Sequence, residues 1–162
     1  MTPLHEACAS GNFDVVQALL KRGASAMCTD MLGDTPLIML CDGNDCFGTL
    51  PTLDLLLAID DVKENVNHQN HSGDTALMAA CENNLYAAAE VLLKQARADV
   101  HICNRDCETA AVMSMSMGHY SMLELLLMYG LDVNEVRSKG PHNTLLLAAC
   151  ARGSEEAVLF LL

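Results

Sequence analysis

The sequence has few basic residues: nine Lys and Arg stand against 21 Asp and Glu, and the formal net charge is −12. Proteins that bind nucleic acid neutralise phosphate groups with clustered Lys and Arg, so we expect no nucleic acid as a direct ligand. Two interpretations of the negative charge stay open. It keeps an apolar-rich chain in solution, or it selects a partner that carries basic segments.

Aromatic residues and long apolar runs are also scarce. Phe, Trp and Tyr make up 4% of the chain, and Trp is absent. No apolar run reaches the roughly 18 residues that a membrane span needs, and the N-terminus lacks the pattern of a signal peptide. We therefore expect a soluble protein without direct membrane insertion. The abundant Leu, Ala, Met and Cys suit closely packed helices.

What the sequence does contain is a repeat. Five segments align on a threonine, at Thr2, Thr35, Thr75, Thr109 and Thr144: "TPLHEAC", "TPLIMLC", "TALMAAC", "TAAVMSM" and "TLLLAAC". The threonines are 33, 40, 34 and 35 residues apart, and in four units an apolar trio starts sixteen residues later. Since neither short helix of such a unit can bury its apolar stripe alone, we predict a stacked array.

Each unit is predicted to form two short helices. In the first unit, Thr2 is a good N-cap and Pro3 occupies the first helical position, where a missing N–H has no cost. Gly11 is suited to end this helix. A second helix is expected from about Phe13 to Lys21, with Gly23 as its stop.

"TPLHEAC…SGNFDVVQALLKRGA" resembles the ankyrin repeat, and "GDTALMAACENNLYAAAEVLLKQARADV" and "GHYSMLELLLMYGLDVN" are similar to the same pattern. The resemblance covers essentially the whole chain. It implies one all-α domain over residues 1–162, an ankyrin-repeat solenoid of stacked helix-turn-helix units with projecting β-hairpin or loop fingers. The repeats are expected at about 2–34, 35–74, 75–108, 109–143 and 144–162. Because the last repeat is truncated and lacks a polar cap, we expect the chain to be a piece of a longer array.

The second unit is seven residues too long. Four extra residues lie in "CDGNDCFGTLPT", between its two helices, and three lie in "AIDDVKENVN", before the following finger. Gly, Asn, Asp and Pro dominate the first insertion, so we expect an exposed loop there. Whether this insertion serves binding or reflects drift stays open.

Four of the eight cysteines occupy one register position, six residues after the threonine: Cys8, Cys41, Cys81 and Cys150. The resemblance implies that this position is a small buried core slot, which favours reduced thiols in an intracellular protein, cytoplasmic or nuclear. Cys107 replaces the usual finger glycine, which predicts a strained turn. The resemblance gives His5 a structural role, tying a helix start to the neighbouring finger.

Nothing in the sequence combines a nucleophile with a base and an orienting acid in one motif. "HICNRDC" does not have a zinc spacing, and "GNDCFG" lacks the lysine of a phosphate loop. We therefore expect a protein that is not an enzyme, with no catalytic residue, no metal site and no cofactor.

The resemblance implies that partners bind on the concave side, which is built from fingertips and the exposed face of each first helix. By register, the candidate partner-binding residues are Asp30, Met31, Leu32, Asp34, Asp42, His71, Asp74, Glu82, Arg105, Asp106, Glu108, Met113, Met117, Lys139, His142 and Arg152. This surface is acidic at its first three junctions and basic at the far end, where Lys139 and Arg152 lie. Met113 and Met117 are four residues apart and share one helical face.

An acidic groove with flexible methionines would suit a partner protein or peptide that is basic and has apolar anchors. The alternative at each position is that finger aspartates close turns and methionines fill gaps. Our leading hypothesis is a monomeric, non-catalytic protein-interaction module within a larger scaffold, adaptor or channel protein. The alternative is a structural spacer array with no partner in the groove.

Overall fold

The fold is that of a computed structural model, which describes residues 1–43, 47–134 and 144–162. The described residues form helices only: α1 (Pro3–Ala9), α2 (Phe13–Lys21), α3 (Pro36–Asp42), α4 (Thr49–Leu57), α5 (Asp60–Glu64), α6 (Ala76–Glu82), α7 (Tyr86–Gln95), α8 (Ala110–Ser116), α9 (Tyr120–Met128), α10 (Leu145–Arg152) and α11 (Glu155–Leu161). Every predicted unit contains the two predicted helices.

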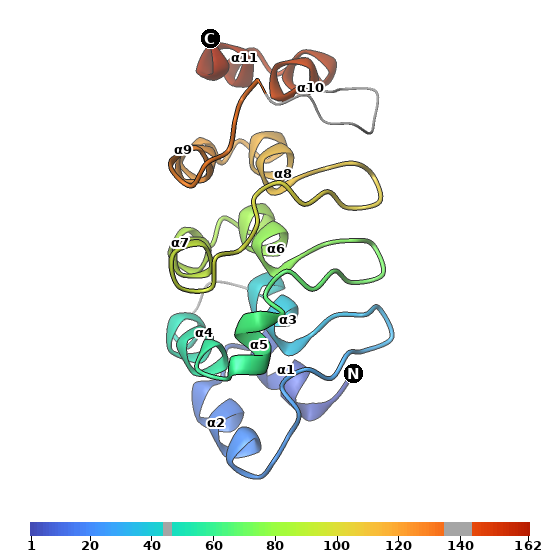
Figure 1. Cartoon of the computed structure of the whole chain (residues 1–162), viewed down its shortest axis with the longest axis vertical. Coiled ribbons are helices and arrows are strands. Elements are labelled where there is room, and N and C mark those ends of the chain that lie inside the picture. The colour runs from blue at the N-terminus through green and yellow to red at the C-terminus, as the bar shows by residue number, and fades with distance from the viewer. Residues whose placement is uncertain (44–46, 135–143) are drawn as a thin grey trace.

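The units stack in chain order into an elongated array (Figure 1). The inner helices α1, α3, α6, α8 and α10 form one column, and each contacts the next along it. The outer helices α2, α4, α7, α9 and α11 form a second column. The fingers project from the inner column on the side away from the outer helices (Figure 1). This arrangement confirms the predicted all-α repeat solenoid.

The repeated threonines begin the inner helices. The hydroxyl groups of Thr35, Thr75 and Thr144 each accept a hydrogen bond from the backbone N–H three residues later, at 3.2 to 3.3 Å. Such a cap satisfies a donor that the first helical turn leaves free. Thr109 differs, because its buried hydroxyl oxygen has no hydrogen-bond partner.

His5 is fully buried and links the first unit to the next finger. Its Nδ1 accepts a hydrogen bond from the Thr2 backbone N–H at 3.1 Å, and its Nε2 lies 2.9 Å from the Asp34 carbonyl oxygen. With Nδ1 as acceptor, the proton is on Nε2 and is donated to that carbonyl. The ring therefore has the structural position that the sequence indicated.

The two insertions in the second unit differ from expectation. The loop is shorter than the expected segment "CDGNDCFGTLPT", because the last residues of that segment already belong to α4, which begins at Thr49. Asn44, Asp45 and Cys46 of this loop lie outside the described residues. Gly48 packs on the preceding turn so closely that a Cβ there would lie 1.7 Å from the Gly11 carbonyl oxygen. The second insertion contains α5, which the sequence did not predict and which buries Val62.

Three of the four register cysteines fill the core slot as predicted: Cys8, Cys41 and Cys81 are fully buried. Burial raises the pKa of each of these thiols to about 12, so they stay protonated at neutral pH. The prediction was wrong for Cys150, which is exposed. The slot is closed by the next unit, and no described helix packs on that face of α10.

None of the helices in the described part of the chain has both the length and the apolar character needed to cross a membrane.

Candidate functional site

One wall of the candidate groove is formed by the fingers, whose turns share one hydrogen-bonding pattern. Five residues before the threonine of the next unit stands Asp30, Asn70 or Asn104. The side-chain oxygen of each accepts hydrogen bonds from the backbone N–H groups two and four residues later, at 2.8 to 3.1 Å. Desolvation acts to raise the pKa of Asp30, but the two N–H donors, together with the positive charge of the N-terminus, hold the pKa below its usual value.

Side chains also join successive fingers. The Asn70 amide donates to the Asp34 carboxylate at 2.8 Å, and the Asn104 amide donates to the Asp74 carboxylate at 2.9 Å. Hydrogen bonds to charged acceptors are the stronger class. Each asparagine therefore closes its own finger and fastens it to the preceding one, which fixes the spacing of the groove wall.

Gly33 and Gly73, three residues after Asp30 and Asn70, lie too close to the next finger for a side chain to fit. Gly33 and Gly73 have φ of +82° and +87°. A Cβ on either would lie 2.9 Å from the backbone nitrogen of the next finger, at His71 or Arg105. Cys107 stands at the same position with φ of +62°, so the predicted strained turn is present.

Between fingers and inner helices lies a hollow of about 150 Å³, which we call the groove hollow. Its lining comes from four successive units and comprises Asp34, Ile38, Asp42, Asn70, Asp74, Ala79, Glu82 and Met113. Four of these eight residues are acidic, and the lining contains no Lys, Arg or His. Coulomb attraction would therefore draw a cationic group into it, while Ile38, Ala79 and Met113 provide apolar surface.

The candidate partner-binding residues are placed as follows. The exposed ones are Met31, Leu32, Asp42, His71, Glu82, Arg105, Asp106, Met117 and Arg152; the half-buried ones are Asp30, Asp74, Glu108 and Met113; Asp34 is buried; and Lys139 and His142 lie outside the described residues. The structure brings five of them together in the groove hollow: Asp34, Asp42, Asp74, Glu82 and Met113.

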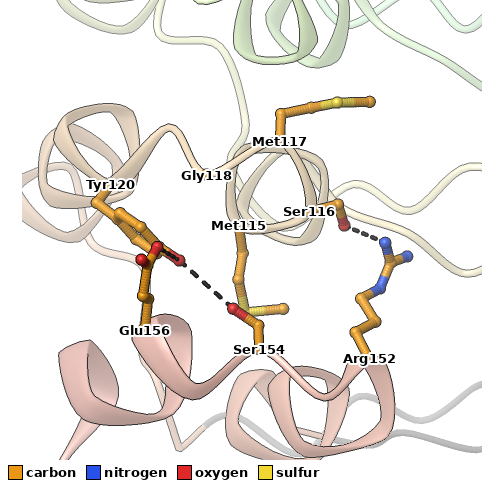
Figure 2. Close-up of a pocket in the computed structure, with 8 residues that line it drawn as sticks. All are labelled: Met115, Ser116, Met117, Gly118, Tyr120, Arg152, Ser154 and Glu156. Atoms are coloured by element: carbon orange, nitrogen blue, oxygen red, sulfur yellow. Dashed lines mark hydrogen bonds between the residues drawn. The ribbon is translucent and has the colours of Figure 1, made fainter.

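The two methionines separate. Met113 is half-buried and lines the groove hollow. Met117, which is 53% exposed, lines a different hollow of about 380 Å³ between the fourth and fifth units. In Figure 2 its side chain points away from α10 and α11. Met115, between them, is buried in the core slot, as predicted.

Arg152 does not present a free positive charge. Its guanidinium forms an ion pair with Glu108 and donates a hydrogen bond to the Ser116 hydroxyl (Figure 2). The positive charge predicted for the far end of the groove is therefore neutralised at Arg152. The neutralising carboxylate is that of Glu108, which the sequence analysis assigned to the acidic part of the surface.

Across the second hollow, the Tyr120 hydroxyl lies 3.4 Å from that of Ser154 (Figure 2). The Tyr120 ring stacks on Phe160, with 5.6 Å between ring centroids. These contacts fasten α9 to α11, so the polar groups of this hollow are used to join two units.

Sequence reasoning missed the asparagine links and two apolar residues of the lining, Ile38 and Ala79. Asn70 and Asn104 could have been found, because each stands five residues before a threonine, as Asp30 does. Ile38 and Ala79 carry no signal of their own. In residues 1–43, 47–134 and 144–162, no group of three or more His, Cys, Asp or Glu side chains is arranged to hold a metal ion.

Comparison with known protein families gives two matches. A family model described as ankyrin repeats in three copies matches residues 45–137, more than half of the chain. A model of a single ankyrin repeat matches residues 1–31.

Proposed function

The chain belongs to the ankyrin repeat family, and from that premise we propose that it is a non-catalytic module that binds a basic segment of a partner protein in its groove. Ankyrin repeats generally serve as protein–protein interaction modules, and the family is typically non-catalytic. The partner is a protein or peptide with Lys or Arg residues and apolar anchors. The module acts intracellularly, as a monomer and within a larger scaffold, adaptor or channel protein.

The observation that carries this proposal is the composition of the groove hollow. Asp34, Asp42, Asp74 and Glu82 line one small volume together with Met113. Like charges held together are unfavourable in the free protein, and a cation that enters relieves their repulsion. Apolar surface beside them suits the methylene stem of a Lys or Arg side chain.

A second support is that the groove wall is held before a partner arrives. The links from Asn70 to Asp34 and from Asn104 to Asp74 fix two of the four carboxylates. A preorganised surface loses less conformational entropy on binding, so a larger share of the contact energy appears as affinity. The first fingertip adds apolar surface, because Met31 and Leu32 are 88% and 65% exposed.

The experiment that tests the proposal compares two charge reversals of the same size. Glu82→Lys changes an exposed residue of the groove hollow, and Glu90→Lys changes an exposed residue of the outer helix α7. Asp74→Lys is less suitable, because it would also break the hydrogen bond from Asn104. Partners captured from a cell extract are identified by mass spectrometry, and their affinities for each variant are measured.

Glu82→Lys is expected to lower the affinity for the captured partner by about tenfold or more, because the new lysine repels the partner's basic segment. Glu90→Lys should leave the affinity unchanged. Binding of the wild-type chain should also weaken as salt is raised. Equal affinities for both variants would reject the groove as the binding site. They would favour the alternative, a spacer array in which only core substitutions have an effect.

A further inference from the structure

Aromatic side chains collect at the edge of the array where turns join the inner and outer helices. The chain has three Phe and three Tyr, and four of them lie at this edge: Phe13, Phe47, Tyr86 and Tyr120. At the start of α2, α4, α7 and α9, one register position holds Phe13, Leu50, Tyr86 and Tyr120. Leu50 and Tyr86 are each 39% exposed, and Phe13 and Tyr120 are partly exposed. A large apolar side chain therefore recurs at this edge in four successive units.

A second row of residues runs beside the first. Three positions earlier in the sequence stand Ser10, Phe47, Asn83 and Met117, of which Phe47 is fully exposed and Met117 is half-exposed. We call the apolar members of both rows the turn stripe: Phe13, Phe47, Leu50, Tyr86, Met117 and Tyr120. The turn stripe shares no residue with the groove hollow. Exposed apolar side chains gathered on one edge mark an interaction surface, so the turn stripe is a second candidate site.

The backbone on both sides of the most exposed aromatic ring is held against the first unit. Gly48 follows Phe47 directly, and a Cβ on it would lie 1.7 Å from the Gly11 carbonyl oxygen. A Cβ on Gly43 would lie 2.5 Å from the Ala9 carbonyl oxygen. An exposed ring on an anchored backbone loses little conformational freedom on binding, which favours Phe47 as an anchor for a partner.

Negative charge accompanies the turn stripe. Asp54, Glu90 and Glu124 follow Leu50, Tyr86 and Tyr120 by four residues, and all three carboxylates are exposed. Residues four apart share one face of a helix, so each carboxylate lies beside its stripe residue. The first six residues of α2, α4, α7 and α9 contain no Lys, Arg or His. Charge complementarity therefore favours an occupant that combines apolar groups with positive charges.

The spacing of the turn stripe selects the conformation of its occupant. Packed helices lie about 8–10 Å apart, so stripe residues of successive units recur at about that interval. A polyproline II helix returns to the same side every three residues and advances about 9.3 Å in that distance. A β-strand returns after about 6.7 Å, and seven residues of an α-helix span about 10.5 Å. The polyproline II repeat is the one that lies within the interval.

Polar and shape features of the stripe suit the same occupant. A polyproline II helix has no internal hydrogen bonds, so its carbonyl oxygens accept from side chains such as the hydroxyl of exposed Tyr86. Aromatic-lined surfaces are the sites on which proline-rich segments dock. At its fourth unit the stripe borders the hollow of about 380 Å³, where Tyr120 and Met117 lie on either side of Gly118 (Figure 2). This hollow offers room for an apolar side chain or a proline ring.

We propose that the turn stripe binds a proline-rich segment of a partner protein in the polyproline II conformation. Every third residue of the segment packs on the stripe, and Arg or Lys residues between them face Asp54, Glu90 and Glu124. This site is separate from the groove and does not depend on the function of the groove.

The probe is a fluorescein-labelled peptide of four Pro-Pro-Arg triplets, and its binding to the chain is measured by fluorescence anisotropy. A peptide of four Gly-Gly-Arg triplets has the same length and charge but no preformed polyproline II helix. We expect the proline peptide to bind about tenfold or more tightly than the glycine peptide, because its backbone is already ordered.

Two substitutions of exposed apolar side chains form a matched pair. Phe47→Ser removes the anchor and should lower the affinity for the proline peptide by about fivefold or more. Met31→Ser changes a fingertip residue that is 88% exposed and should leave this affinity unchanged. Neither side chain belongs to the buried core, so both variants should fold as the wild-type chain does.

Charge reversal distinguishes this site from the groove. Glu90→Lys should lower the affinity for the proline peptide, and Glu82→Lys, in the groove hollow, should leave it unchanged. The opposite order is expected for a partner bound in the groove. Either proposal can therefore fail while the other stands.

Three results would overturn the proposal. The first is a proline peptide that does not bind. The second is equal affinity for the two peptides, which would show attraction by charge alone. The third is binding that Glu82→Lys abolishes and Phe47→Ser preserves, because the peptide would then lie in the groove.

Discussion

Replacing Asn104 with alanine is the most informative single test of how the groove is held. Asn104 is 9% exposed, and its side chain makes three hydrogen bonds. The oxygen accepts from the backbone N–H groups of Asp106 and Glu108 at 3.0 and 2.9 Å, and the amide donates to the Asp74 carboxylate at 2.9 Å. Asn104→Ala removes all three and leaves their partners with only partial access to water.

The expected cost follows from these bonds. A neutral intramolecular hydrogen bond contributes about 0.5–1.5 kcal/mol net, and one to a charged group about 1.5–3 kcal/mol. Asp74 is half-buried, so the charged bond belongs at the lower end of its range. We expect Asn104→Ala to lower the free energy of unfolding by about 3 kcal/mol. Urea denaturation followed by circular dichroism measures this value.

A side-chain swap isolates the link between fingers. Asn104→Asp keeps the acceptor for both N–H groups but sets a carboxylate against Asp74, and should destabilise the chain through like-charge repulsion. Adding Asp74→Asn restores an amide–carboxylate pair with donor and acceptor exchanged, and should recover most of the loss. A loss below about 1 kcal/mol for Asn104→Ala, or no recovery in the double variant, would refute the conclusion that Asn104 closes its own finger and fastens it to the preceding one.

Three further predictions concern strain, thiols and packing. Cys107→Gly should raise the free energy of unfolding by about 1 kcal/mol, because glycine adopts positive φ without steric cost; a destabilised variant in urea denaturation would contradict this. Cys8, Cys41 and Cys81, with thiol pKa raised from 9.0 to about 12, should escape alkylation of the native chain at pH 8 in peptide mapping. Above pH 9 the thiols of the unfolded chain ionise while the buried thiols stay protonated, so the free energy of unfolding should fall by up to about 1.4 kcal/mol per pH unit and thiol. Urea midpoints that do not decrease between pH 9 and 11 would contradict this prediction. Leu126→Ala, at a fully buried side chain of α9, should cost about 2–5 kcal/mol as a cavity, and a loss under about 1 kcal/mol in urea would argue against the packing described.

The threonine register was enough to predict the paired helices, because cap, apolar stripe and turn recur together in each unit. The additional helix α5 could not be predicted this way. Five residues are too few for a helical period to be visible, and α5 depends on packing Val62 against the rest of the second unit. Cys150 shows the same limit, since the burial of a repeat position depends on a neighbour and not on the residue itself.

For the groove, the candidate residues predicted by register include the four acidic side chains that line the groove hollow with Met113, and their role in binding stays a prediction. Register could not reveal that Arg152 pairs with Glu108, because that contact joins residues 44 positions apart in sequence and depends on how two units stack. The roles of Asn70 and Asn104 were readable in principle from their fixed distance to the next threonine. The volume enclosed between fingers and helices follows only from the packed array.

The most direct test of the central claim is an amide-exchange footprint of the chain bound to its captured partner. The account predicts slowed exchange in α3, α6 and the fingers at residues 30–34 and 70–74, with the outer helices α4, α7 and α9 unchanged. Slowed exchange confined to the outer helices would place the partner on the opposite face and contradict the groove assignment.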